Sequence, residues 1–150
     1  MDNKIKIAVD AMGGDGSPKK IIDGISDHNK KSKNIKYLIF GNKDIISKYI
    51  PKSLDKGSYD IIDTKNFVEG KDTPLEAVKR GKNTSMWLSI ESVKDKKADI
   101  VISAGNTGAL LVISKLNLKM IENIDKPALS ALWPNKKGMS VVLDLGANIE

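Results

Sequence analysis

The fold of this chain is decided by the stretch Asp99-Ile100-Val101-Ile102-Ser103-Ala104-Gly105-Asn106-Thr107-Gly108-Ala109-Leu110-Leu111. It begins with a short β-branched apolar run, which is typical of a strand buried on both faces of a sheet. The turn that follows holds Gly105 and Gly108, and the apolar segment after it predicts a helix packed on that sheet. A strand, a glycine turn and a helix N-terminus bring free N–H groups and the positive end of the helix dipole together. The stretch therefore predicts an anion site or, on a simpler interpretation, only a tight turn.

The composition is that of a globular domain. Of the 150 residues, 40% are hydrophobic and 29% are charged, so we expect residues 1–150 to form a single domain with its own core. The net charge of +6 comes from scattered lysines, which favours a solvated basic surface over a mild attraction for acidic partners or anionic lipid. Aromatic residues are only 5%, and no basic stretch is interleaved with them. We therefore expect no nucleic-acid partner.

The chain lacks the sequence features of secreted and membrane-spanning proteins. It has no cysteine, which excludes disulfides and thiolate metal sites. The N-terminus Met1-Asp2-Asn3-Lys4 lacks the apolar stretch of a signal peptide, and no window has the length of a membrane span. These features predict a cytoplasmic location.

Strand and helix signals alternate along the chain. Strands are expected at 5–9, 37–40, 59–62, 100–103, 128–133 and 139–143. Helices are expected after Ser17-Pro18, with Ser17 as N-cap, at 43–50, after the capping box of Thr73 and Glu76, from Ser85, and after Thr107. Strands separated by helices predict an α/β fold with a parallel sheet covered on both faces.

Polar, glycine-bearing turns follow three of the expected strands. They are Asp10 with Gly13-Gly14-Asp15, the turn from Ser103 to Gly108, and Asp144 to Asn148. Ligands of parallel sheets bind beyond the carboxyl ends of the strands. The three turns are therefore expected along one edge, where they would form a single site.

The common nucleotide and metal motifs are absent or weak. No GxGxxG follows the first strand and no GxxxxGK[ST] occurs. Asp10, Asp15 and Asp144 are possible Mg²⁺ ligands, although loop aspartates more often cap turns. The single histidine, His28, lies in a charged helical tail and offers no basis for a histidine triad. No metal and no cofactor is predicted.

Several motifs resemble the PlsX family, the bacterial acyl-(acyl-carrier-protein):phosphate acyltransferases. The long ones are Ile7-Ala8-Val9-Asp10-Ala11-Met12-Gly13-Gly14-Asp15, Ile102-Ser103-Ala104-Gly105-Asn106-Thr107-Gly108-Ala109-Leu110 and Leu143-Asp144-Leu145-Gly146-Ala147-Asn148. Supporting matches are Asp72-Thr73-Pro74, Val78-Lys79-Arg80, Thr84-Ser85-Met86 and Asp125-Lys126-Pro127-Ala128-Leu129. The resemblance extends over essentially the whole chain.

The resemblance implies a fold, a reaction and partners. The fold would be a three-layer α/β/α sandwich with a mostly parallel sheet, similar to phosphotransacetylases and to isocitrate- and isopropylmalate-type dehydrogenases. The enzyme would move a fatty acyl group from acyl carrier protein to inorganic phosphate, and the acyl phosphate would serve phospholipid synthesis. Full-length relatives would be homodimers with peripheral membrane contact at the inner membrane, and a membrane-bound glycerol 3-phosphate acyltransferase would act next.

Two departures from the family pattern stand out. Gly16-Ser17 replaces a bulkier residue and alanine before the proline, which loosens that loop. Family members are also about twice as long, so this chain resembles only their N-terminal half, and the C-terminal half is expected to be absent.

The chemistry of this reaction assigns roles to the turn residues. Phosphate is itself the nucleophile, so the protein must hold a dianion and stabilise the thioester oxyanion. Backbone N–H groups from Gly105 to Gly108, with the side chains of Ser103, Asn106 and Thr107, are predicted to bind phosphate. The Gly13 and Gly14 amides or Asn148 are predicted to stabilise the oxyanion. Asp10 and Asp15, which would repel phosphate as carboxylates, are assigned to loop shaping or to a hydrogen bond with a protonated oxygen, and no general base is identified.

Two other classes of function stay open on the residues alone. One is a different enzyme on the same sheet, such as a short-chain phosphotransacetylase or a metal-dependent dehydrogenase relative. The other is a truncated, non-catalytic remnant that folds and binds phosphate or a partner without turnover.

Overall fold

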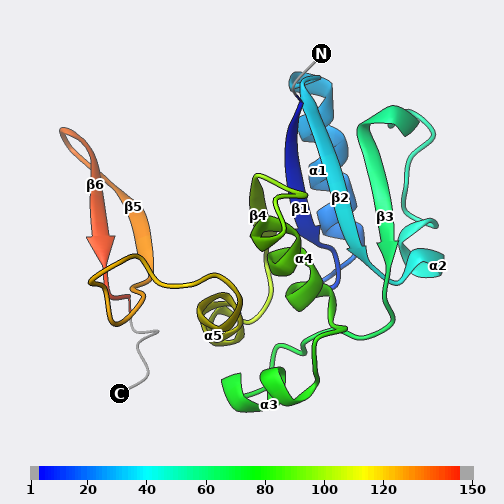
Figure 1. The fold of residues 1–150 in the computed structure, drawn as a ribbon. Coiled ribbons are helices and arrows are strands. Elements are labelled where there is room, and N and C mark those ends of the chain that lie inside the picture. The colour runs from blue at the N-terminus through cyan, green and yellow to red at the C-terminus, as the bar shows by residue number, and fades with distance from the viewer. Residues whose placement is uncertain (1–3, 146–150) are drawn as a thin grey trace.

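A four-stranded parallel sheet forms the centre of the protein, whose computed structural model describes residues 4–145 (Figure 1). The strands are β1 (Ile5–Asp10), β2 (Ile35–Gly41), β3 (Tyr59–Asp63) and β4 (Ile100–Ser103). They lie in the order β3-β2-β1-β4. In this register Ile7 of β1 lies opposite Tyr37 on one side and Ile100 on the other. All strands therefore end at the same edge, as the alternating sequence predicts.

Helices cover both faces of the sheet, which makes a three-layer α/β/α fold. On one face α1 (Lys19–Lys31) and α2 (Lys43–Ile46) pack on side chains such as Val9 and Ile39. On the other face α4 (Ser85–Lys94) packs on Ala8 and Phe40. Successive strand residues alternate between these two cores because side chains of a strand point to opposite faces. The predicted fold class is confirmed.

A third apolar cluster positions the beginning of α5 (Thr107–Asn117). It joins α5, α4 and α3 (Pro74–Lys79) through the buried residues Val68, Ala77, Met86, Trp87, Ile90, Ala109 and Ile113. The predicted capping box is present: the Thr73 side chain accepts from the Glu76 N–H, and the Glu76 carboxylate accepts from the Thr73 N–H. None of the helices within residues 4–145 combines the length and the apolarity needed to span a bilayer.

The prediction that residues 100–103 are buried on both faces is wrong in this structure. Within residues 4–145, β4 is the last strand of the sheet and pairs only with β1. Ile100 and Ile102 are 48% and 50% exposed, while Val101 packs inward against the α4 side. A β-branched run reports strand propensity, but the number of neighbours decides its burial.

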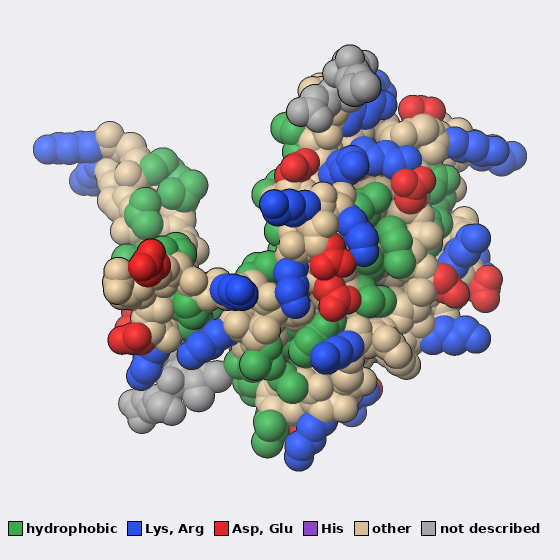
Figure 2. All heavy atoms as spheres, in the orientation of Figure 1, with side chains coloured by type: hydrophobic (Ala, Val, Ile, Leu, Met, Phe, Trp, Pro, Cys, Tyr) green, Lys and Arg blue, Asp and Glu red, His purple; other side chains and the backbone are tan. Residues whose placement is uncertain are grey.

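The expected strands at 128–133 and 139–143 exist but do not join the parallel sheet. β5 (Ser130–Asn135) and β6 (Gly138–Leu143) form a separate antiparallel hairpin. Figure 1 draws the hairpin apart from the sheet, beyond α5, and Figure 2 shows hydrophobic side chains on its surface. Only Lys136 and Lys137 connect the two strands, and so short a connection permits antiparallel pairing but no crossover.

Two helix predictions need correction in detail. Ser17 does not cap α1: its hydroxyl donates to the Gly13 carbonyl oxygen at 2.5 Å, and the helix begins after Pro18 with no side-chain cap. The expected helix at 43–50 is regular only over α2 (Lys43–Ile46), and turns follow it. A 3-10 turn, η1 (Lys56–Ser58), then leads into β3.

Candidate functional site

A polar cleft of about 710 Å³ opens at the carboxyl ends of β1 and β4. Three segments line it: the loop after β1, the segment that leads to α3, and the turn between β4 and α5. The lining residues are Met12, Gly14, Asp15, Phe67, Val68, Glu69, Gly70, Ala104, Gly105, Asn106, Thr107 and Gly108. Two of the three predicted turns therefore meet at one site.

Glycines allow the two turns to touch. A Cβ atom on Gly13 would lie 2.9 Å from the Gly105 Cα atom, closer than real Cβ contacts allow. Gly14 has a φ of +89°, and a Cβ there would collide with the Ala104 carbonyl oxygen. A Cβ on Gly105 would meet the Met86 methyl group at 2.9 Å. The glycines thus serve close packing of backbone on backbone, which brings the N–H groups of both turns to the same cleft.

Asp10 lies beneath these turns and does not line the cleft. Its side chain is only 1% exposed. One carboxylate oxygen accepts from the Ser85 hydroxyl at 2.7 Å, and the other accepts from the Ser103 hydroxyl at 2.7 Å. These hydrogen bonds tie β1 to α4 and β4. The geometry agrees with the loop-shaping role that the sequence suggested for Asp10.

The Ser103 hydroxyl forms hydrogen bonds that hold the turn in place. Its hydroxyl donates to Asp10 and accepts from the Gly105 N–H at 3.1 Å. The Gly105 N–H is therefore engaged within the turn. Of the predicted phosphate ligands, these two groups already have protein partners.

The Asn106 side chain likewise forms hydrogen bonds with other groups of the protein. Its Oδ1 accepts from the Ala109 N–H at 2.9 Å and caps α5. Its Nδ2 donates to the Gly70 carbonyl at 3.0 Å and to the Asp72 carbonyl at 2.7 Å. Asn106 thus fixes the beginning of α5 to the opposite wall of the cleft.

The free donors of the turn include those of Thr107 and Gly108. Within the part of the chain that the structure describes, their backbone N–H groups have no hydrogen-bond partner. Both residues line the cleft, and Thr107 is exposed. The N–H groups of Gly14 and Asp15 also have no partner among residues 4–145. The α5 terminus and the β1 loop therefore offer backbone donors to the same space.

The opposite wall carries an ion-pair network that the sequence analysis did not identify as part of the site. Arg80 donates from Nε and Nη2 to the two Asp72 oxygens at 2.5 and 2.8 Å, and its Nη2 lies 3.0 Å from Glu69 Oε1. The Arg80 hydrogen bonds hold the pKa of Asp72 below its usual value, and in turn they raise the pKa of Arg80. The sequence signals were the position of Asp72 and Arg80 at the two ends of the capping-box helix and their presence in two of the motifs that resemble the family.

The proposed Mg²⁺ ligands are not brought together. Asp10 binds the two serine hydroxyls, Asp15 lies in the cleft, and Asp144 follows β6 in the separate hairpin. Residues 4–145 contain no group of three or more His, Asp or Glu side chains suited to a metal ion. The third predicted turn is not on the expected edge at Asp144, and Asn148 lies outside the described residues.

Comparison with known proteins decides the family. Residues 5–150 match the family described as "Fatty acid synthesis protein". The chain belongs to this family. A phosphate acyltransferase of Pelagibacter ubique is 74% identical over 150 residues, which are 100% of this chain and 45% of the relative. The resemblance to the PlsX acyltransferases is thereby confirmed.

More distant members of the family give the same result. Phosphate acyltransferases of Bradyrhizobium diazoefficiens and Rhodospirillum rubrum are each 42% identical over 151 residues. These matches include 99% and 100% of this chain, and 43% of each relative. The chain therefore spans less than half the length of the curated relatives it matches.

Proposed function

We propose that this chain supplies the phosphate-binding part of a phosphate acyltransferase. The reaction would transfer a fatty acyl group from acyl carrier protein to inorganic phosphate and give an acyl phosphate. The observation that carries the proposal is the pair of free N–H groups of Thr107 and Gly108, which face a polar cleft at the beginning of α5. The name shared by the relatives, phosphate acyltransferase, supports phosphate as the anion.

The N–H groups would hold phosphate by charge-assisted hydrogen bonds. The dipole of α5 adds a partial positive charge at the same point, and the Gly14 and Asp15 amides approach from the other turn. A phosphate held there needs no covalent nucleophile from the protein. Its oxygen would attack the thioester carbon, the new C–O bond would form, and the C–S bond would break with its electron pair leaving on sulfur.

Positioning and charge stabilisation are the two contributions expected of this chain. Holding phosphate against the thioester removes much of the entropic barrier. Donors aimed at the developing oxyanion lower the barrier further. Gly13 is buried, so the exposed Gly14 amide is the better oxyanion donor of the two. Asp10 would act as a positioning residue through its serine partners, and Asp15, which lines the cleft, would hydrogen-bond a protonated phosphate oxygen.

The cellular setting follows from the family resemblance. The proposal includes a cytoplasmic enzyme that assembles as a homodimer and contacts the inner membrane peripherally. Its product would pass to a membrane-bound glycerol 3-phosphate acyltransferase. These partners are proposed for the full-length enzyme.

Two substitutions at one position test the phosphate site. Thr107→Pro removes the N–H at the first helical position, where proline is tolerated, and Asn106 already has the extended φ of −59° and ψ of 117° that a following proline requires. Thr107→Ala removes only the hydroxyl. We expect Thr107→Pro to lose at least about half of the phosphate-dependent rise in Tm, because ligand stabilisation follows affinity. Thr107→Ala should retain it.

The measurement is thermal unfolding with phosphate titrated through the millimolar range, at constant ionic strength. An equal phosphate effect in Thr107→Pro and the unchanged chain would refute the site. For the reaction, thiol release from palmitoyl-carrier protein is followed with and without phosphate, in the presence of the polypeptide that completes the relatives' length. Faster release from acetyl-CoA would instead favour a short-chain phosphotransacetylase.

A further inference from the structure

Among the residues that the structure describes, β4 has one edge without a pairing strand, and it carries apolar side chains on one face of the sheet. Ile100 and Ile102 lie opposite Ile7 and Val9 of β1, so all four side chains share the α1 face. Ile7 and Val9 are buried, whereas Ile100 and Ile102 are half exposed. Helix α1 thus covers β1 but not β4.

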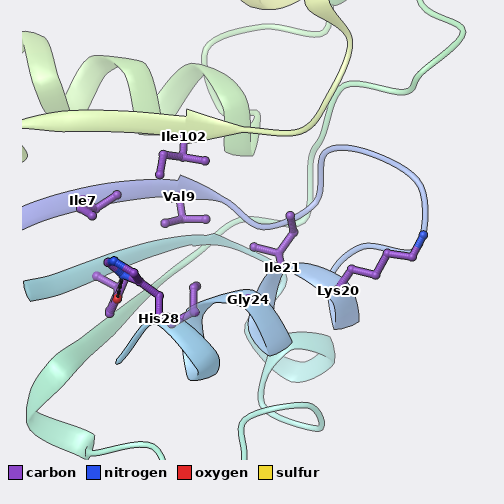
Figure 3. Close-up of a pocket in the computed structure, with 9 residues that line it drawn as sticks. Ile7, Val9, Lys20, Ile21, Gly24, His28 and Ile102 are labelled. Carbon is purple, nitrogen blue, oxygen red and sulfur yellow. Dashed lines mark hydrogen bonds between the residues drawn. The ribbon is translucent and has the colours of Figure 1, made fainter. Parts of the chain in front are cut away.

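An apolar groove of about 310 Å³ lies between α1 and this part of the sheet (Figure 3). Ile7, Val9 and Ile102 line it from the sheet, and Ile21, Gly24 and Ile25 line it from α1. A Cβ on Gly24 would have nothing within 4 Å, so the helix leaves this space open. The space is therefore bounded by apolar surface from two elements.

Polar groups mark the two ends of the groove. His28 Nδ1 lies 2.7 Å from the Tyr37 hydroxyl at one end, and Lys20 lies at the other (Figure 3). Among the described residues, no hydrogen bond brings a polar side chain into the middle of the groove. An occupant would accordingly present apolar side chains to it.

We propose that the β4 edge and the α1 groove form a docking surface for one strand and one helix of another polypeptide segment. That segment corresponds to the part of the Pelagibacter relative that this chain does not match. The strand would pair parallel to β4, and the helix would pack beside α1 with its side chains in the groove.

Three observations select this occupant. More than half of the relative's length has no counterpart in this chain, so a long polypeptide is available to cover it. Sheets of parallel strands are covered on both faces in α/β proteins, whereas the α1 face of β4 is uncovered within residues 4–145. A strand that joins a parallel sheet brings a crossover helix onto one face, which matches an open edge next to an open groove.

The proposal is tested by co-expression of the tagged chain with the unmatched C-terminal part of the Pelagibacter relative. We expect the two polypeptides to co-purify in equal amounts. Hydrogen exchange followed by mass spectrometry should slow at least tenfold in the peptide that holds residues 99–104. An unpaired strand edge exchanges readily, while a paired one is protected.

Two variants separate docking from folding. Ile102→Lys places a charge on the docking face at a side chain that is half exposed, so the isolated chain should keep its circular dichroism spectrum and lose at least tenfold in binding. Gly24→Leu fills the groove and also removes a helix-interior glycine, so thermal stability should hold while binding falls. Ile45→Lys, an exposed isoleucine on α2, is the matched control and should bind normally.

The other occupants are distinguishable outcomes that would overturn the proposal. A homodimer that Ile102→Lys dissociates, with no binding of the C-terminal polypeptide, would assign the edge to a second copy. Protection of residues 99–104 by dodecanoate, but not by the polypeptide, would assign the groove to an acyl chain. Equal binding by Ile102→Lys and Ile45→Lys would refute a role for β4. None of these readouts uses phosphate or turnover, so they stand or fall separately from the proposed function.

Discussion

The parallel sheet and the β5–β6 hairpin are built from similar strand sequences but differ in what covers them. In the sheet, Ile39 of β2 is completely buried between strands and helices. In the hairpin, Leu132 and Val141 lie opposite each other and are 66% and 67% exposed. Strand sequence therefore encodes the extended backbone in both regions, while burial depends on which partner is present.

The register of the hairpin gathers five of its apolar side chains on one face. Leu132 and Val141 form one cross-strand pair, Pro134 and Met139 form the next on the same face, and Leu143 continues it. Two strands alone are marginally stable in water. This face consequently contributes little to stability until something packs on it.

The largest expected effect tests the sheet. Ile39→Ala should lower the free energy of unfolding by about 3 kcal/mol, because it leaves a cavity in a fully packed core. Urea unfolding followed by far-UV circular dichroism measures the change. A loss similar to that of an exposed alanine substitution would mean that the sheet is less tightly packed than the structure describes.

A prediction of intermediate size tests how much the ion pair between Asp72 and Arg80 contributes to stability. Arg80 lowers the pKa of Asp72 in the folded state, so ionised Asp72 stabilises the fold above its unfolded pKa. That contribution is fully present above the unfolded pKa and is lost as the pH falls through the lowered folded pKa. Asp72→Asn should therefore destabilise the chain at neutral pH and approach the unchanged chain at low pH.

The control for this acid dependence is Asp27→Asn. Lys30 also lowers the pKa of Asp27, but both side chains of that pair are largely exposed. Exposed pairs are screened by water and contribute little to stability. Thermal unfolding across the acid range should thus change much less for Asp27→Asn, and equal pH profiles of the two variants would contradict the assigned role of Asp72.

The smallest expected effect tests the hairpin. Leu132→Ala should change the free energy of unfolding by less than about 0.5 kcal/mol, since most of the side chain is in water. The same urea titration used for Ile39→Ala gives the value. A cost comparable to that of Ile39→Ala would place the hairpin face in a core, and the contrast between the two regions would disappear.

Several local features of the fold were predictable from the sequence, whereas features set by distant partners were not. The capping box of Thr73 and Glu76 involves residues three apart, and it forms as predicted. The edge position of β4 depends on the number of neighbouring strands, which a β-branched run does not encode. The hairpin was recognised as two strands, but its antiparallel pairing was missed.

The candidate site shows the same division. Its place beyond the ends of β1 and β4 followed from the general rule for parallel sheets. The hydrogen-bond partners of the polar side chains did not follow from this rule, because the Asn106 side chain donates to carbonyl groups 34 and 36 residues away. The sequence predicted that the side chains of Asn106 and Ser103 bind phosphate. In the structure both side chains form hydrogen bonds within the protein. The backbone N–H groups of Thr107 and Gly108, by contrast, have no partner among residues 4–145.

The buried carboxylate of Asp10 has a consequence for biosynthesis. Its hydroxyl partners on Ser85 and Ser103 lie 75 and 93 residues later in the chain. On the ribosome, the N-terminal strand emerges well before either serine, and its carboxylate stays hydrated until both arrive. The floor beneath the cleft is therefore completed only after Ser103 has left the ribosome, well after β1 itself has emerged.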